Sequence, residues 1–137
     1  MWWNREKKLA DPLGPLETGV LEVIWSRGES AVRDVAQHLS QRLAYTTVMT
    51  TLDRLFKKGL LDRRKEDRAF VYSARFSRVD LERLRARAMV NGFLAGPEPS
   101  VLISCLVDAA VQHDEALLNE LEEKIRLKRE ELNRRKP

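Results

Sequence analysis

Residues 44–59 read AYTTVMTTLDRLFKKG, and this stretch carries the clearest helical pattern of the chain. Its apolar side chains recur at helical spacing, at Val48, Leu52, Leu55 and Phe56. The spacing predicts a helix from about Tyr45 to Lys58 that buries these four side chains. Gly59 follows the helix, and glycine readily adopts the left-handed conformation in which helices end.

The opposite face of this helix is rich in threonine. At about 100° per residue, the side chains that point outward are Thr46, Thr50, Asp53, Arg54 and Lys57, with Thr47 and Thr51 beside them. Threonine is a mediocre helix former, so several threonines on one helix face suggest that they serve a function. Threonine suits thymine methyls, base edges and phosphates, and arginine suits guanine or phosphate. The alternative is a solvated helix surface whose threonines cap the N-terminus.

Two shorter patterns precede this helix, and a hairpin follows it. Apolar spacing predicts helices over about residues 14–27 and over Val32–Leu39. Residues 60–65 and 68–73 read as two strands joined by Glu66-Asp67. The hairpin tip is basic, with Arg63, Arg64, Lys65 and Arg68. Three helices and a basic hairpin predict a winged helix-turn-helix, in which the third helix enters the major groove.

The remainder of the chain reads as three helices, expected over residues 79–94, 101–111 and 115–135. In the last, a narrow apolar stripe contains Leu118, Leu121, Ile125 and Leu132. A small head cannot bury this stripe together with the preceding apolar helix, so we predict a homodimer. The expected fold is mainly α with a small two-stranded wing: an N-terminal winged-helix DNA-binding domain at 1–76 and a C-terminal helical dimerisation region at 77–137.

Charge is distributed unevenly along the 137 residues, whose net charge is +4. Residues 1–74 carry 13 basic and 10 acidic side chains, and residues 75–96 carry 5 and 2. Residues 97–123 carry 7 acidic and no basic side chains, whereas residues 124–137 carry 7 basic and 2 acidic ones. This alternation suggests two tasks in one chain.

Composition disfavours several classes of protein. The single cysteine, Cys105, allows no disulfide within the chain, and with two distant histidines it makes no metal-binding pattern. Cys105 is expected to be a small buried hydrophobe. No apolar run approaches the roughly 20 residues of a membrane span, and residues 1–8 lack the features of a secretory signal. No catalytic constellation or phosphate loop indicates an enzyme. We therefore expect a cytoplasmic protein with no cofactor, metal or membrane contact.

Four aromatic residues allow two interpretations. Stacking of single-stranded bases would use Trp25, Phe56, Phe70 and Tyr72. Their helical or alternating spacing favours positions in the core.

Five segments carry a resemblance to a known family: LGPLE (13–17), VIW (23–25), AYTTVMTTLDRL (44–55), KKGL (57–60) and RAFVY (68–72). They resemble the penicillinase repressor family (BlaI/MecI), to which the copper-responsive CopY repressors are related. The resemblance is close from about Leu13 to Tyr72 and most specific around residues 45–55. The tail is similar only in length and helical pattern.

The resemblance implies a homodimeric winged-helix repressor of a palindromic operator with an inverted TACA/TGTA core. It puts Thr46, Thr47, Thr50 and Arg54 on the recognition helix, and Arg63, Lys65 and Arg68 on the wing. Together with Lys57, these are the predicted DNA-binding residues. Asp67 stands where the family commonly has glycine, and because aspartate tolerates left-handed backbone, the turn is expected to form.

Two features of the family are missing. The copper branch carries C-x-C pairs, which one cysteine cannot supply. In the β-lactam branch a sensor metalloprotease triggers cleavage at an Asn-Phe bond, a dipeptide that this chain lacks; its nearest counterpart is Cys105-Leu106. The expected partners are therefore an operator duplex, a second copy of the chain and a sensor protease of unknown identity, while the inducing signal stays open.

The competing hypothesis is a protein-interaction adaptor, in which the winged helix binds no specific DNA and the terminal helix docks a partner. A DNA-binding dimer predicts sequence-specific, steeply salt-dependent retention of duplex DNA. An adaptor predicts none.

Overall fold

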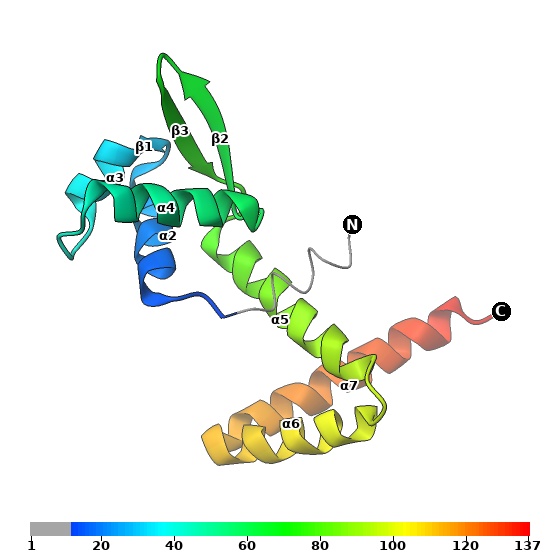
Figure 1. The fold of residues 1–137 in the computed structure, drawn as a ribbon. Helices are drawn as coiled ribbons and strands as arrows, with labels where there is room; N and C mark the ends of the chain where they lie inside the picture. The colour runs from blue at the N-terminus through cyan, green and yellow to red at the C-terminus, as the bar shows by residue number, and fades with distance from the viewer. Residues whose placement is uncertain (1–11) are drawn as a thin grey trace. The chain divides into compact units, whose positions relative to one another are not determined.

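The computed structural model describes residues 12–137 (Figure 1). Its elements are α2 (Pro15–Arg27), β1 (Ser30–Ala31), α3 (Val32–His38), α4 (Tyr45–Lys57), β2 (Leu61–Glu66), β3 (Ala69–Ala74), α5 (Arg78–Leu94), α6 (Pro99–His113) and α7 (Glu115–Arg135). All six helices predicted from apolar spacing are present. The prediction about a secretory signal concerns residues 1–8, which lie outside the described residues.

Contacts divide the chain into two compact units. The first, here called the head, extends to Asn91, and the second comprises residues 92–137. The division falls inside α5, beyond the boundary at residue 76 that separates the two predicted tasks. The two units are defined by their internal contacts alone. That residues 1–76 bind DNA and residues 77–137 dimerise therefore stays a prediction.

The core of the head lies between α2, α3, α4 and the sheet. Its largest fully buried side chains are Val20, Leu21, Ile24, Val35, Val48, Leu52, Leu55, Leu61 and Tyr72. Leu81 of α5 joins this core and is only 3% exposed. Trp25 Nε1 donates a hydrogen bond of 2.9 Å to the Phe76 carbonyl oxygen, which ties α2 to the segment before α5.

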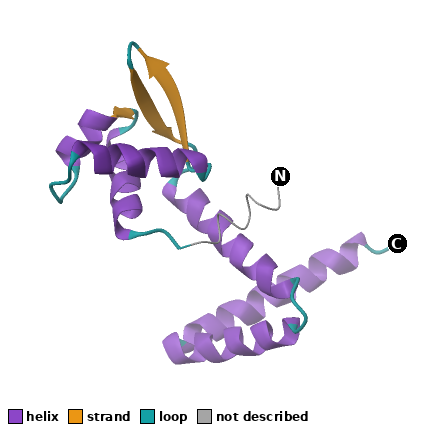
Figure 2. Cartoon of the chain, viewed as in Figure 1, coloured by secondary structure: helices purple, strands orange, loops and turns teal. Residues whose placement is uncertain are grey.

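The sheet has three strands where the sequence predicted two. Its order is β1-β3-β2 and all pairs are antiparallel, with Ser30 opposite Tyr72 and Ala31 opposite Val71 (Figure 2). The prediction of a purely two-stranded sheet was therefore wrong. Two residues are too short to show an alternating pattern, and β1 exists because the free edge of β3 offers backbone partners.

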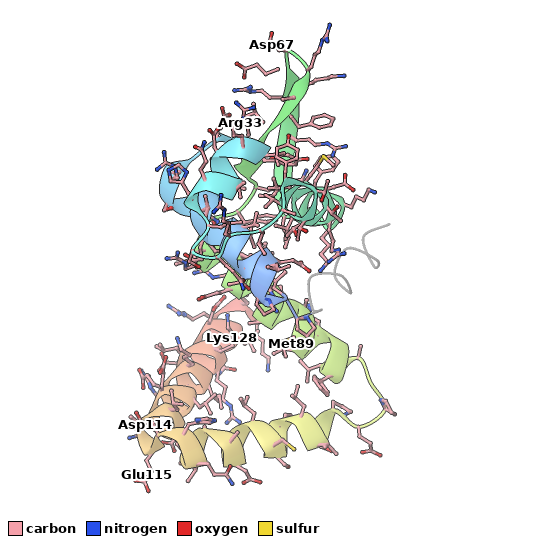
Figure 3. The ribbon with its side chains drawn as sticks, turned by 60° about the vertical axis from the view of Figure 1, so that its left-hand side comes forward. Arg33, Asp67, Met89, Asp114, Glu115 and Lys128 are labelled. Atoms are coloured by element: carbon pink, nitrogen blue, oxygen red, sulfur yellow. The ribbon has the colours of Figure 1, made fainter. Side chains whose placement is uncertain are left out.

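The β2–β3 hairpin, here called the wing (residues 61–74), turns through Asp67 and Arg68, one residue later than predicted. Asp67 lies at its tip (Figure 3) and has a φ of 55°. The expectation that aspartate supports a left-handed turn here is confirmed.

Helix α4 ends in a way that its sequence anticipated. Gly59 has a φ of 83°, and its N–H donates to the Phe56 carbonyl while the Leu60 N–H donates to that of Leu55, both at 3.0 Å. These two bonds satisfy carbonyls that would otherwise lack partners at the helix end. The chain consequently turns directly from α4 into β2, so the wing starts beside the helix.

The second unit is a helical hairpin in which α6 and α7 pack side by side (Figure 1). Asp114 separates them, and its carboxylate accepts a hydrogen bond of 2.9 Å from the Ala116 N–H, capping α7. Much of the apolar surface stays exposed, at Val101, Ile103, Leu106, Val107, Val111, Leu117, Ile125, Leu127 and Leu132. No helix within residues 12–137 is long and apolar enough to cross a membrane.

Cys105 is exposed, so the prediction that it is buried was wrong. The reason is that α6 is apolar on more sides than α7 alone covers. Apolar composition predicted burial, but a single helical hairpin buries little of each helix: Ala110 is the one buried side chain of α6.

Candidate nucleic-acid interface

The outward face of α4 carries the predicted polar row. Thr46, Thr50 and Arg54 are exposed, while Val48, Leu52 and Leu55 on the inward face are fully buried. Of the two flanking threonines, Thr47 is half-buried and Thr51 is buried. The predicted exposure of this row and of Lys57 is therefore confirmed, whereas Asp53, also predicted to point outward, is half-buried.

Threonine hydroxyls on this helix donate to the backbone one turn earlier. Thr50 Oγ1 donates to the Thr46 carbonyl and Thr51 Oγ1 to the Thr47 carbonyl, both at 2.8 Å. Each bond uses the single hydroxyl hydrogen and leaves the oxygen lone pairs free. Thr50 thus presents a methyl group and a hydrogen-bond acceptor on an exposed face.

Two side chains of this face were missed by the sequence argument. Tyr45 is 53% exposed and Met49 is 43% exposed, and they are four residues apart on α4, next to Thr46 and Thr50. The signal was available, because both residues fall outside the inward apolar row. An exposed aromatic and a thioether on such a face offer apolar contacts to base methyl groups.

The four basic residues of the wing differ in their surroundings. Arg64 pairs with Glu29 at 2.7 Å and with Glu66 at 2.6 Å. Lys65 and Arg68 are exposed and form no ion pair within residues 12–137. Arg54 on α4 is likewise exposed and unpaired among those residues. Among Arg54 and the four basic residues of the wing, these three are the exposed cations without an ion pair within residues 12–137.

Arg63 is held in the joint between the wing and α4. Its guanidinium carbon lies 3.9 Å from the ring centre of Phe56 and 4.2 Å from that of Phe70. Its Nη1 also donates to Asp53 Oδ1 at 3.0 Å. Hydrogen bonding with Tyr72 is the main cause that raises the pKa of Arg63, with a further contribution from Asp53 and an opposing effect of burial.

Asp53 connects two cations of the interface. Lys57 Nζ lies 2.9 Å from Asp53 Oδ2 and Arg63 Nη1 lies 3.0 Å from Oδ1. Hydrogen bonding from Lys57, and then from Arg63, lowers the pKa of Asp53 below its usual value. Asp53 therefore stays ionised and neutralises part of the charge at the end of α4.

Lys58, the next residue after α4, points into the head. Its Nζ is 2.8 Å from Glu17 Oε2, and the two side chains are 23% and 9% exposed. The two adjacent lysines therefore differ in their surroundings: Lys57 is exposed, whereas Lys58 connects the end of α4 to Glu17 of α2.

Of the four aromatic residues that allowed two interpretations, three support the core. Tyr72 is fully buried, and Trp25 and Phe56 pack partly buried against the core. Phe70 is 38% exposed and lies against Arg63. Within residues 12–137, no three His, Cys, Asp or Glu side chains gather where they could hold a metal ion.

Three helices with a threonine-bearing third helix, followed by a basic wing, define a winged-helix DNA-binding protein. Residues 13–127 match the sequence model of a family described as penicillinase repressor. The chain belongs to the penicillinase repressor family, which confirms the resemblance noted from its motifs.

Individual relatives agree with this membership. The transcriptional regulator BlaI of Mycobacterium tuberculosis is 37% identical over 115 residues, covering 81% of this chain and 83% of the relative. The penicillinase repressor of Bacillus licheniformis is 30% identical over 122 residues, covering 88% and 91%. A solution structure of monomeric Bacillus licheniformis BlaI in complex with the blaP half-operator has 32% identity and a TM-score of 0.44, covering 51% of this chain and 88% of that one.

Proposed function

We propose that this member of the repressor family binds double-stranded DNA sequence-specifically and represses transcription, acting as a homodimer on a palindromic operator. The carrying observation is the exposed row of Thr46, Thr50 and Arg54 on α4. The wing that follows directly in the chain adds Lys65 and Arg68, which are exposed and unpaired among the described residues.

In this proposal α4 enters the major groove. The face formed by Thr46, Thr47, Thr50 and Arg54 meets base edges, and Lys57 reaches a neighbouring phosphate. A threonine whose hydroxyl hydrogen bonds within the helix offers a methyl to thymine and lone pairs to base amino groups. Arg54 lies two turns after Thr46 and reaches either guanine or phosphate.

The wing lies along the DNA backbone in this proposal. Lys65 and Arg68 neutralise phosphates, and neutralised phosphates release counterions, so their contribution is independent of sequence and depends on salt. In this proposal α4 therefore discriminates between DNA sequences, and the wing raises the affinity for any duplex.

Residues 77–137 join the two heads. The support is the apolar surface that α6 and α7 leave exposed, which includes Ile125 and Leu132 of the predicted stripe. Leu118 and Leu121 of the same stripe are half-buried in the single chain. A second copy would cover the exposed part, and the separation of the heads would follow from that pairing.

The test compares two sets of variants on two duplexes. Bound duplexes are first selected from a random pool with the full-length protein, which yields the operator. Thr46→Ala or Thr50→Ala should then reduce discrimination between operator and scrambled duplex by about 1 kcal/mol or more per half-site. Lys65→Ala or Arg68→Ala should weaken both duplexes alike and flatten log K against log salt by about one unit per lost contact.

Equal losses on both duplexes for the threonine variants would contradict the reading role of α4. A pool that yields no preferred sequence, together with no retention of duplex DNA, would instead support the adaptor. Action on DNA fits the expected cytoplasmic location. A sensor protease stays an expected partner, for which the missing Asn-Phe bond leaves the cleavage site open.

A further inference from the structure

Beyond Arg63 the wing keeps few contacts with the rest of the head: Ala31 of β1 is opposite Val71, and Arg64 pairs with Glu29 at 2.7 Å. Leu61 and Tyr72 are fully buried at the base of the wing, whereas every side chain from 64 to 70 is exposed. Arg63 is directly opposite Tyr72 in the β2–β3 register. The Arg64–Glu29 pair is exposed, so among the side-chain contacts at the base of the wing the half-buried ones of Arg63 should contribute most to the orientation of the outer wing.

Those contacts are made by three side chains of two elements. Phe56 and Asp53 belong to α4, and Phe70 belongs to β3 on the outer side of the register. The guanidinium lies over both rings, at 3.9 and 4.2 Å, and pairs with the carboxylate at 3.0 Å. Only 23% of the Arg63 side chain is exposed. A planar guanidinium can satisfy all these contacts at once, which an ammonium group cannot.

The alternation of strand side chains links this joint to the wing tip. Residues 61, 63 and 65 of β2 share one face of the sheet. Lys65 is opposite Phe70 in the register, and Phe70 is the outer ring on which Arg63 lies. Fixing Arg63 consequently fixes where Lys65 stands relative to α4.

We propose that Arg63 is a positioning residue that sets the wing relative to the recognition helix, and does not itself contact phosphate. This inference rests on the proposed function, because it assumes that α4 and the wing tip engage one half-site together. A phosphate contact would require Arg63 to leave Asp53 and the two rings. With the joint intact, Arg54 on α4 and Lys65 on the wing reach the duplex as one rigid surface.

The first measurement uses the free protein and needs no DNA. Amide hydrogen exchange over residues 64–71 is compared in full-length wild type, Arg63→Lys and Asp53→Asn, with Arg64→Lys as the matched control. Arg64 is also an arginine of β2, but it pairs with exposed glutamates and lies on no ring. We expect amide exchange to become about tenfold faster in Arg63→Lys and Asp53→Asn, because each loses a few weak contacts that hold the wing. The exchange rate of the control, Arg64→Lys, should not change. Unchanged exchange in Arg63→Lys would overturn the proposal.

The second measurement is a double-mutant cycle of Arg63→Lys and Lys65→Ala, in which the affinity of each variant for the selected operator is measured. In the wild-type background, Lys65→Ala is expected to weaken binding. In an Arg63→Lys background the same substitution should cost several-fold less, because the wing no longer holds Lys65 in place. Asp53→Asn should also weaken operator binding, although it removes a negative charge near DNA. Additive effects of Arg63→Lys and Lys65→Ala, or tighter binding by Asp53→Asn, would overturn the proposal.

Failure of the proposed function is recognised separately. Wild type would then show no operator preference, whereas the exchange experiment would still report whether Arg63 orders the wing. Thermal unfolding of each variant verifies that the head is folded, and Arg63→Lys keeps the positive charge of the wild-type side chain.

Discussion

Replacing Lys58 by methionine is expected to destabilise the head by about 3 kcal/mol, because Glu17 then stays buried without its partner. In the wild type Lys58 Nζ lies 2.8 Å from Glu17 Oε2, with side chains 23% and 9% exposed. At an effective dielectric constant of about 20, unit charges at this distance attract by about 6 kcal/mol. Desolvation offsets most of that attraction in the wild type. The variant loses the attraction and keeps the desolvated carboxylate.

Urea unfolding of the full-length chain at one fixed protein concentration, followed by circular dichroism, measures this loss. The double variant Glu17→Leu, Lys58→Met should lie within about 1 kcal/mol of wild type, since apolar residues replace both charges. Asp62→Asn is the control, because Asp62 pairs with Arg75 at 2.7 Å but is exposed; its loss should be under about 1 kcal/mol. A loss for Lys58→Met no larger than that of the control would refute the reasoning.

Two further predictions concern assembly and release. Truncation after Asn91 keeps Leu81 and Ala88 in the core and should give a monomeric head with much weaker operator affinity. Sedimentation equilibrium measures the mass, and an intact chain that is monomeric at micromolar concentration would contradict the dimer. Stoichiometric copper or zinc should leave the operator complex intact, because the chain has one cysteine and two distant histidines. Release of the operator DNA at one equivalent of copper or zinc in a gel-shift titration would contradict this prediction.

The helices could be predicted because their signal is local. Apolar spacing along residues 44–59 predicted a helix over 45–58, and α4 covers Tyr45–Lys57. The same rotation placed Thr46, Thr50 and Arg54 on the exposed face. Both results follow from 3.6 residues per turn, which requires no knowledge of the rest of the fold.

The third strand could not be predicted from a pattern. Ser30 and Ala31 become a strand only because β3 presents a free edge to them. Their partners, Tyr72 and Val71, lie about 40 residues further along the chain. Pairing at such a separation depends on how the helices bring the segments together.

The roles of individual basic residues also depended on the fold. Arg63 and Lys65 are two residues apart, yet the first is enclosed by Asp53 and two rings and the second is exposed. Lys57 and Lys58 are adjacent, yet only Lys58 reaches Glu17. Charge by itself predicted four equal wing cations and gave no means of separating them.

The amino-acid sequence alone was enough to predict the order of helices and hairpin, the inward and outward faces of α4, and the family to which the chain belongs. Each of these is written in short-range spacing or in contiguous motifs. Which charged side chains form ion pairs became known from the folded structure. Lys58 and its partner Glu17, for example, are 41 residues apart in the sequence. A side chain's partner is set by the packing of distant segments, and that packing is a property of the whole fold.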